Sequence, residues 1–179
     1  AVKPLHGFGA EAEHPFLIVT DGSQAPVAIL GTAPFEAATA GPERLLRFQL
    51  GADANGPAAV TSRVASGWRV GEWHHVAATW GASDGRMALY VDGEQVASGL
   101  LRQGPAWAPG EVWVGGRADG ELSAFCEIDD VCLYRVARRP QEIRADYARF
   151  RPALRAVDTA HWSPGVPAGF SLDLLPPAL

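Results

Sequence analysis

The sequence predicts an all-β fold, a sandwich or a barrel, with one short helix near the C-terminal end. The chain contains 20 Gly and 14 Pro, which together are 34 of its 179 residues. Turn-rich β folds need such residues, whereas helix bundles tolerate them poorly. Short stretches rich in β-branched and aromatic residues recur at a spacing of about 8–12 residues, and turn signals such as Asp-Gly separate them.

The composition is that of one globular domain. Hydrophobic residues make up 47% of the chain and charged residues 20%, which is enough apolar material for a real core. Apolar runs such as 16–19 are far shorter than the roughly 20 residues of a membrane-spanning helix, so no membrane insertion is expected. The net charge of −5 and the scattered cations argue against nucleic acid as a partner.

The first half of the chain predicts few elements. Residues 27–30 predict a short strand, and the Ala, Gly and Pro residues of 31–42 predict a long loop. Residues 44–50 alternate between apolar and polar side chains, and 58–64 are rich in β-branched residues. With the turn signals between them, these two stretches predict a hairpin.

The middle of the chain predicts three successive strands, over 73–80, 86–91 and 94–97. Asp92-Gly93 predicts the two-residue turn of a tight hairpin, in which both residues adopt positive φ. Side chains alternate between the two faces of a strand. The second strand therefore presents two apolar faces, formed by Met87, Leu89 and Val91 and by Ala88 and Tyr90.

The last elements predicted are two strands and a helix. Residues 112–115 predict a short strand and 125–134 the longest strand of the chain. Pro140 suits the first position of a helix over 140–149, and Pro152 is expected to end it. Residues 1–150 are therefore expected to form the folded domain, and 151–179 a Pro-rich tail or linker.

The two cysteines are expected to be free thiols. Cys126 and Cys132 are six residues apart in the predicted strand 125–134. At about 3.3 Å per residue their Cα atoms would lie roughly 20 Å apart. A disulfide requires about 4.4–6.8 Å, so the strand would have to break for the bond to form.

Three blocks of sequence resemble the laminin G-like, concanavalin A-like lectin/glucanase family. They are GEWHHVAATW at 71–80, LYVDGEQVA at 89–97, and IDDVCLY at 128–134 followed by RPQEI at 139–143. The blocks occur in the family's order. The resemblance implies an all-β, two-sheet antiparallel jelly-roll sandwich of the concanavalin A-like type, with one short C-terminal helix.

The resemblance also implies a function. It implies a non-catalytic module that recognises a glycan or protein ligand at or outside the cell surface, and hence an extracellular or cell-surface location. The alternative is a structural accessory domain or subunit that docks onto a larger enzyme or assembly without a soluble ligand of its own. The fold hosts many activities, so the site has to decide between them.

Asp129 is the residue that the resemblance implies as a ligand of calcium. Calcium takes several oxygen ligands from carboxylates and carbonyls. Neighbouring strand side chains point to opposite faces, so Asp130 can join Asp129 on one ion only where the strand ends or bulges. The other interpretation is that the Asp129 carboxylate caps turn amides.

The carboxylates of this segment do not predict an enzyme. Glu127 and Asp129 resemble part of the Glu-x-Asp-x-x-Glu strand of laminarinase-like glycosidases, which needs two catalytic carboxyl groups. The position of the second acid is held by Val131 or, with a bulge, by Cys132. No Gly-x-Ser-x-Gly elbow occurs either.

Exposed tryptophans are candidates for binding the apolar faces of sugar rings. Trp68, Trp107 and Trp162 lie in turn-like or Pro-rich contexts and are the predicted ligand-binding residues. The other three, Trp73, Trp80 and Trp113, lie in predicted strands and are expected in the core.

The adjacent His74 and His75 resemble a metal-binding pair, but neighbouring strand side chains diverge and could not share one zinc ion without a distorted backbone. One ring is therefore expected to be packed or hydrogen-bonded and the other exposed.

Overall fold

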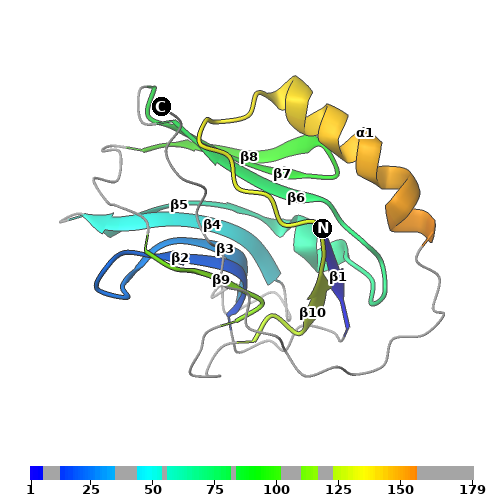
Figure 1. Ribbon diagram of the computed structural model, residues 1–179, viewed down its shortest axis with the longest axis horizontal. Helices are drawn as coiled ribbons and strands as arrows, with labels where there is room; N and C mark the ends of the chain where they lie inside the picture. The colour runs from blue at the N-terminus through cyan, green and yellow to red at the C-terminus, as the bar shows by residue number, and fades with distance from the viewer. Residues whose placement is uncertain are drawn as a thin grey trace, which may run out of the picture.

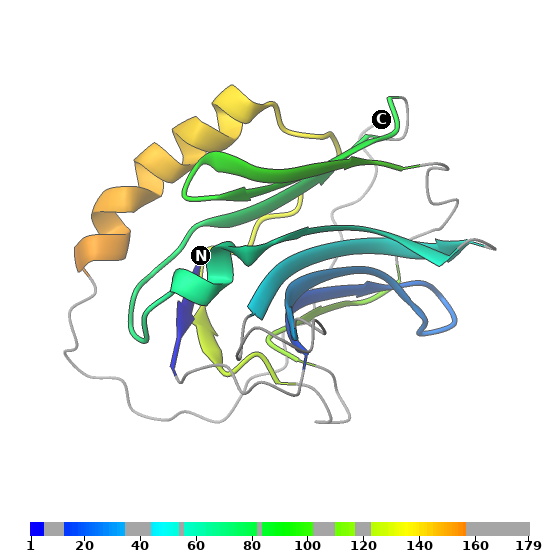
Figure 2. The ribbon, with the colours of Figure 1, turned by 180° about the vertical axis from the view of Figure 1, so that it is seen from behind.

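The computed structural model describes residues 1–5, 13–34, 44–53, 56–81, 84–101, 110–116 and 123–156. Within these residues two antiparallel sheets stack on one another, and one helix lies on the outer side of the smaller sheet (Figure 1). The view from behind shows the strongly bent strands of the larger sheet below the flatter strands of the smaller sheet (Figure 2). The predicted all-β sandwich with a C-terminal helix is confirmed.

The larger sheet has the order β5-β4-β3-β2-β9 in the described part of the chain. Its strands are β2 (His14–Thr20), β3 (Pro26–Pro34), β4 (Arg44–Asp53), β5 (Gly56–Ser62) and β9 (Val112–Val114). The predicted hairpin is confirmed as β4–β5, and a 3-10 helix, η1 (Arg63–Gly67), follows it. The predicted loop over 31–42 is wrong at its start because β3 continues to Pro34, and residues 35–42 lie outside the described part.

The smaller sheet has the order β6-β7-β8, with strands β6 (Val76–Trp80), β7 (Arg86–Val91) and β8 (Glu94–Leu100). The predicted tight turn is confirmed, because φ is +51° at Asp92 and +82° at Gly93. The first of the three strands is shorter than predicted. It begins at Val76, and before it His74 forms a single bridge with Val2.

The core lies between the two sheets, and β7 shows how the sequence builds it. Met87, Leu89 and Val91 belong to the inter-sheet core, where Leu89 is 0% exposed. Ala88 and Tyr90 lie on the opposite face and pack with Ile143 of the helix in a second cluster. Both predicted faces of β7 are therefore buried, one by the larger sheet and one by the helix.

The N-terminal strand β1 (Val2–Pro4) pairs with β10 (Cys126–Ile128) at one end of the sandwich. The predicted strand over 125–134 is wrong in most of its length. Phe125 and Asp130 adopt positive φ, +46° and +51°, so the backbone leaves the strand conformation on both sides of β10. Both cysteines are free thiols, and burial raises the pKa of Cys126 to about 12.

Helix α1 (Pro140–Ala156) crosses the outer face of the smaller sheet. It begins at the predicted Pro140 but does not end at Pro152. Proline fixes φ near −65°, a value that a helix can accommodate. Because proline has no backbone N–H, the helix gives up one hydrogen bond at this position but keeps its helical geometry. Among the described residues, no helix is long and apolar enough to cross a membrane.

Candidate functional site

The outer face of the larger sheet carries a row of side chains that points away from the core. By strand register, Trp113 of β9 pairs with Ile18 of β2, Ile18 with Ile29 of β3, and Ile29 with Gln49 of β4. Paired residues lie on one face of a sheet. Their chain neighbours, such as Phe48 on β4, belong to the inter-sheet core, so this row lies on the face of the sheet turned away from that core. Ile18 is nevertheless buried, at 2% exposed, while Trp113, Ile29 and Gln49 are half-buried.

Polar side chains continue this surface at one end. Arg47 of β4 donates a hydrogen bond from Nη1 to Oε1 of Glu13 at 2.9 Å, and a second from Nη2 to Oε1 of Gln49. The Arg47 side chain is 33% exposed and that of Glu13 44% exposed. Partly exposed, mutually bonded groups of this kind hold a fixed orientation and keep further hydrogen-bonding capacity for a ligand.

Gly31 forms the floor of a shallow depression on this face, bordered by Pro15, Ile29 and Arg47. The backbones of β2 and β3 come very close there. A Cβ atom at position 31 would lie 2.4 Å from the carbonyl oxygen of His14 and 2.6 Å from Cα of Pro15. The depression therefore depends on glycine.

We call Trp113, Ile18, Ile29, Gly31, Glu13, Arg47 and Gln49 the outer-face patch. It combines half-buried Trp113 and Ile29 and buried Ile18 with a guanidinium, a carboxylate and an amide. Sugar rings present apolar C–H faces that an aromatic ring can cover, and hydroxyl groups that such polar groups can bind. The patch therefore combines apolar and hydrogen-bonding groups on one face of the larger sheet.

The three predicted ligand-binding tryptophans do not come together in the described part of the chain. Trp68 is half-buried and packs against the core. Its ring stacks on that of His74, with centroids 4.4 Å apart, because η1 ends just before it and turns it inward. Trp68 therefore does not stand free as an exposed platform, and Trp107 and Trp162 lie outside the described residues.

Sequence reasoning missed Trp113. It was expected in the core because its strand is short and apolar, yet its register partner Ile18 faces outward and its neighbour Val112 packs against the core. The alternation Val-Trp-Val contained this signal, because the middle residue of three must face away from the outer two. It could not be used without knowing which face of β9 is buried.

Asp129 and its neighbours make other contacts within the described part of the chain. Asp129 is exposed directly after β10, and its Oδ1 accepts a hydrogen bond from the backbone N–H of Asp130 at 2.8 Å. This is the amide-capping contact of the alternative interpretation. Glu127 instead forms an ion pair with Lys3 at 2.6 Å. Among the described residues, no three His, Cys, Asp or Glu side chains lie close enough to hold one ion.

The two adjacent histidines diverge, as predicted. The His74 ring stacks on Trp68 and contacts Oδ2 of Asp92 through Nδ1 at 3.0 Å, while the His75 ring lies 6.1 Å from that of Tyr147 on α1. The exposure prediction is wrong, because both rings are half-buried. The backbone N–H of His75 donates to Oδ1 of Asp92 at 2.9 Å, so one carboxylate in the tight turn braces both residues.

This brace predicts a pH-dependent loss of stability. Burial by itself raises the pKa of Asp92, but the hydrogen bonds from His74 and His75 outweigh it and lower the pKa below its usual value. The stabilisation is therefore complete above the unfolded-state pKa of about 3.9 and is lost as the pH falls through the folded-state value. We expect Asp92→Ala to cost about 1.5–3 kcal/mol at pH 7, the usual range for a hydrogen bond to a charged group.

The measurement is urea unfolding of the wild type and Asp92→Ala at pH 7 and at pH 3. The difference in unfolding free energy should shrink at pH 3. An equal difference at both pH values would mean that the charge of Asp92 has no part in it.

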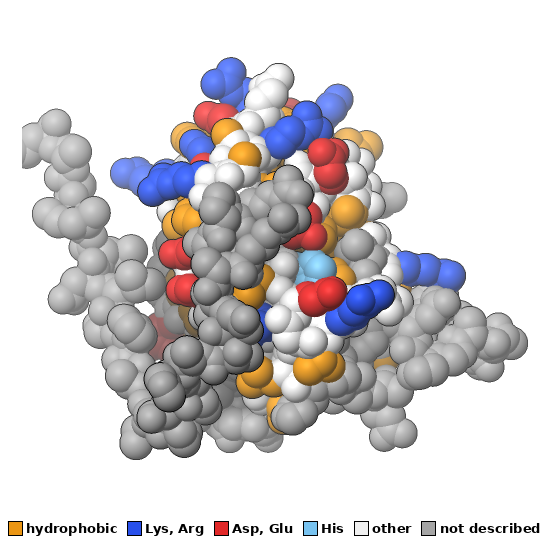
Figure 3. Space-filling view, turned by 90° about the vertical axis from the view of Figure 1, so that its right-hand side faces the viewer, with side chains coloured by type: hydrophobic (Ala, Val, Ile, Leu, Met, Phe, Trp, Pro, Cys, Tyr) orange, Lys and Arg blue, Asp and Glu red, His pale blue; other side chains and the backbone are white. Residues whose placement is uncertain are grey.

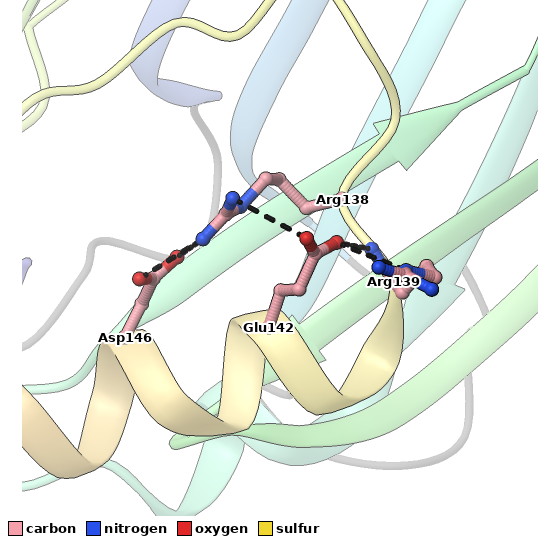
Figure 4. Close-up of polar contacts among 4 residues, drawn as sticks. All are labelled: Arg138, Arg139, Glu142 and Asp146. Carbon is pink, nitrogen blue, oxygen red and sulfur yellow. Dashed lines mark hydrogen bonds and ion pairs between the residues drawn. The ribbon is translucent and has the colours of Figure 1, made fainter.

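A cluster of ion pairs and hydrogen bonds connects the start of α1 to the residues just before it (Figure 4). The Arg138 guanidinium bonds Asp146 at 3.0 and 3.2 Å and approaches Glu142 at 3.6 Å. Glu142 also accepts the backbone N–H of Arg139 at 2.7 Å, which caps the helix. Arginine side chains surround α1 in the space-filling view (Figure 3), but those of Arg138, Arg139 and Arg144 are paired with acids. This cluster is explained by helix capping and anchoring.

Comparison with known proteins identifies one family from the sequence and a similar fold among the solved structures. The family model described as the concanavalin A-like lectin/glucanases superfamily matches residues 13–144. A native heptameric SAP-like pentraxin from Limulus polyphemus aligns with a TM-score of 0.59 at 19% identity, over 80% of this chain and 64% of the pentraxin. An S-layer domain-containing protein from Clostridium thermocellum aligns at 17% identity with a TM-score of 0.36, over 79% of this chain and 65% of the S-layer chain. No curated protein matches the sequence.

Proposed function

The chain belongs to the concanavalin A-like lectin/glucanases superfamily, and we propose that it is a non-catalytic recognition module that binds a glycan through the outer-face patch of its larger sheet. One observation carries the proposal. The strand register places Trp113, Ile18 and Ile29 in a row that ends at Gln49, and Gln49 is bonded to Arg47. The half-buried Trp113 ring and fixed hydrogen-bonding groups therefore share one face of the sheet.

The proposal includes a location at or outside the cell surface. The family resemblance supports this location. The heptameric assembly is a property of the pentraxin.

Glycan binding is tested directly on an immobilised library of neutral and acidic glycans. We expect the wild-type chain to bind a restricted set of them. Gln49→Ala should weaken that binding by several-fold, because one bonded amide of the patch is lost. The matched control is Gln141→Ala, on the exposed side of α1, which should bind as the wild type does.

A structural accessory role is the second candidate, and the chain before α1 favours it. Apolar side chains are exposed there: Val131, Leu133, Tyr134 and Val136, at 46%, 51%, 51% and 72%. Exposed apolar stretches of this kind mark contacts with other proteins. A chain that binds no glycan but forms a stable complex with a host polypeptide would support this candidate.

The proposed function does not include catalysis. Retaining glycosidases need two carboxyl groups about 5–5.5 Å apart. Glu127 is paired with Lys3, and Asp129 lies beyond the end of β10. The outer-face patch contributes a single carboxylate, that of Glu13, among its residues, and it is bonded to Arg47. Its chemistry is that of binding.

Calcium at Asp129 stays a prediction from the family resemblance, and a thermal scan tests it. A ligand that binds only the folded state at a hundredfold excess over Kd stabilises it by about 2.7 kcal/mol. For a chain of this length that corresponds to roughly 5–10 °C in Tm. If Asp129 binds calcium, the rise should vanish in Asp129→Asn and persist in Asp130→Asn. Superimposed curves in calcium and in chelator would remove calcium from the account.

A further inference from the structure

An ion pair sets the charge of the depression over Gly31. Arg47 of β4 is the register partner of Gly31 of β3, and its Nη1 lies 2.9 Å from Oε1 of Glu13. Among the described residues that line the depression, Glu13 and Arg47 are the charged ones, and the others are apolar or carry a hydroxyl or an amide. The described lining therefore has one positive charge, one negative charge and no net charge.

Both members of the pair keep hydrogen-bonding capacity for a ligand. A guanidinium has five N–H donors, and within the described part of the chain Arg47 uses one on Glu13 and one on Gln49. A carboxylate has two acceptor oxygens, and the bond from Arg47 goes to Oε1 of Glu13, which leaves Oε2 for another donor. Thr61 of β5, the other register partner of Arg47, is exposed and adds a hydroxyl without a charge.

Neighbouring hydroxyl groups of a neutral sugar match this pair. Each hydroxyl is both a donor and an acceptor, so one can donate to Oε2 of Glu13 while the next accepts an N–H of Arg47. Both bonds involve a charged partner and are stronger than bonds between neutral groups. A carboxylated sugar fits less well. Its carboxylate only accepts hydrogen bonds, is repelled by Glu13, and loses water without gaining an unpaired cation.

We propose that Glu13 determines the class of glycan that the outer-face patch accepts. By neutralising Arg47, it selects neutral sugars with neighbouring hydroxyls over their carboxylated counterparts. This selectivity rests on the proposed function, because it concerns the same patch and the same kind of ligand. Without Glu13, the guanidinium would be an unpaired cation at the surface, a group well suited to bind a carboxylate.

The test measures affinity for matched pairs of oligosaccharides at pH 7 and physiological salt. The pairs are oligomers of glucose, galactose or mannose and of the corresponding uronic acids, which differ in a hydroxymethyl or a carboxylate group. The wild type should bind a neutral member at least about fivefold more tightly than its acidic counterpart. Equal or tighter binding of the acidic member would overturn the selectivity and leave glycan binding in place. Binding of neither member of any pair would also overturn it, and the proposed function fails as well only if the whole glycan library is unbound.

Variants assign the selectivity to Glu13. Glu13→Gln keeps an oxygen that can accept from Arg47 but removes the charge, so the neutral-over-acidic affinity ratio should fall at least about fivefold. The control is Glu72→Gln, the same change of net charge at an acid 4.0 Å from Arg69 and outside the patch, which should keep the wild-type ratio. Arg47→Gln should gain no acidic glycan. Because the ratio compares two ligands on one protein, a loss of folded protein does not change it. An unchanged ratio in Glu13→Gln, or an equal fall in Glu72→Gln, would overturn the proposal.

Discussion

Leu89→Ala should cost about 2–5 kcal/mol of unfolding free energy, the range for large-to-small changes in a core. Leu89 lies on the central strand of the smaller sheet and is 0% exposed. Its register partners are Ala78 and Ala97, which are too small to close the cavity that the substitution leaves. The loss should therefore fall in the upper half of the range.

Urea unfolding measures this cost, and Leu100→Ala is the matched control. Leu100 lies on the neighbouring strand β8 but is 76% exposed. Its substitution should change stability by less than about 0.5 kcal/mol, as surface changes usually do. Equal losses for the two variants would contradict the assignment of the inter-sheet core.

Gly31→Ala should destabilise the larger sheet although it adds one methyl group. The new Cβ would meet backbone atoms, the carbonyl oxygen of His14 at 2.4 Å and Cα of Pro15 at 2.6 Å, so β2 and β3 must move apart. Overpacking of this kind costs roughly 1–3 kcal/mol. The shift should also widen the depression of the outer-face patch and weaken glycan binding.

Thermal unfolding and the glycan library measure the two effects. Gly22→Ala is the control, because nothing lies within 4 Å of a Cβ at that position and its φ is not in the left-handed region. It should leave stability within about 0.5 kcal/mol of the wild type. A Gly31→Ala protein as stable as Gly22→Ala would show that the two strands are not so closely packed.

The sequence predicted best where local rules decide the structure. In β7 the alternation of side chains is local, and the two clusters of the structure divide it as expected. The turn at Asp92-Gly93 requires a backbone conformation that few residue pairs tolerate, so its type follows from the pair.

The predictions from sequence failed where pairing between distant segments determines the secondary structure. β1 is a strand because Val2–Pro4 pairs with Cys126–Ile128, more than 120 residues away, and three residues show no pattern of their own. The strand expected over 125–134 ends at Ile128, although Val131 and Leu133 continue the apolar alternation. The turn at Asp130 ends it, and the sequence does not show that this aspartate adopts positive φ.

For the candidate site, the sequence predicted the kind of side chain involved, a tryptophan, but not which residues form the site. A tryptophan platform was expected, but the structure places Trp68 against His74 and gives the outward position to Trp113. Glu13, Arg47 and Gln49 meet because β4 lies beside β3 in one register, and single-sequence patterns do not specify register between strands.

Binding of three proteins to one immobilised glycan library tests the central claim most directly: the wild type, Trp113→Ala and Trp73→Ala. Trp73 is the matched control, because it is also half-buried but lies before β6, with Lys3 5.1 Å from its ring. Wild type and Trp73→Ala should bind the same glycans. Trp113→Ala should lose at least about tenfold in affinity, or 1.4 kcal/mol, as expected for an aromatic anchor. Glycan binding by Trp113→Ala at wild-type strength would contradict the account.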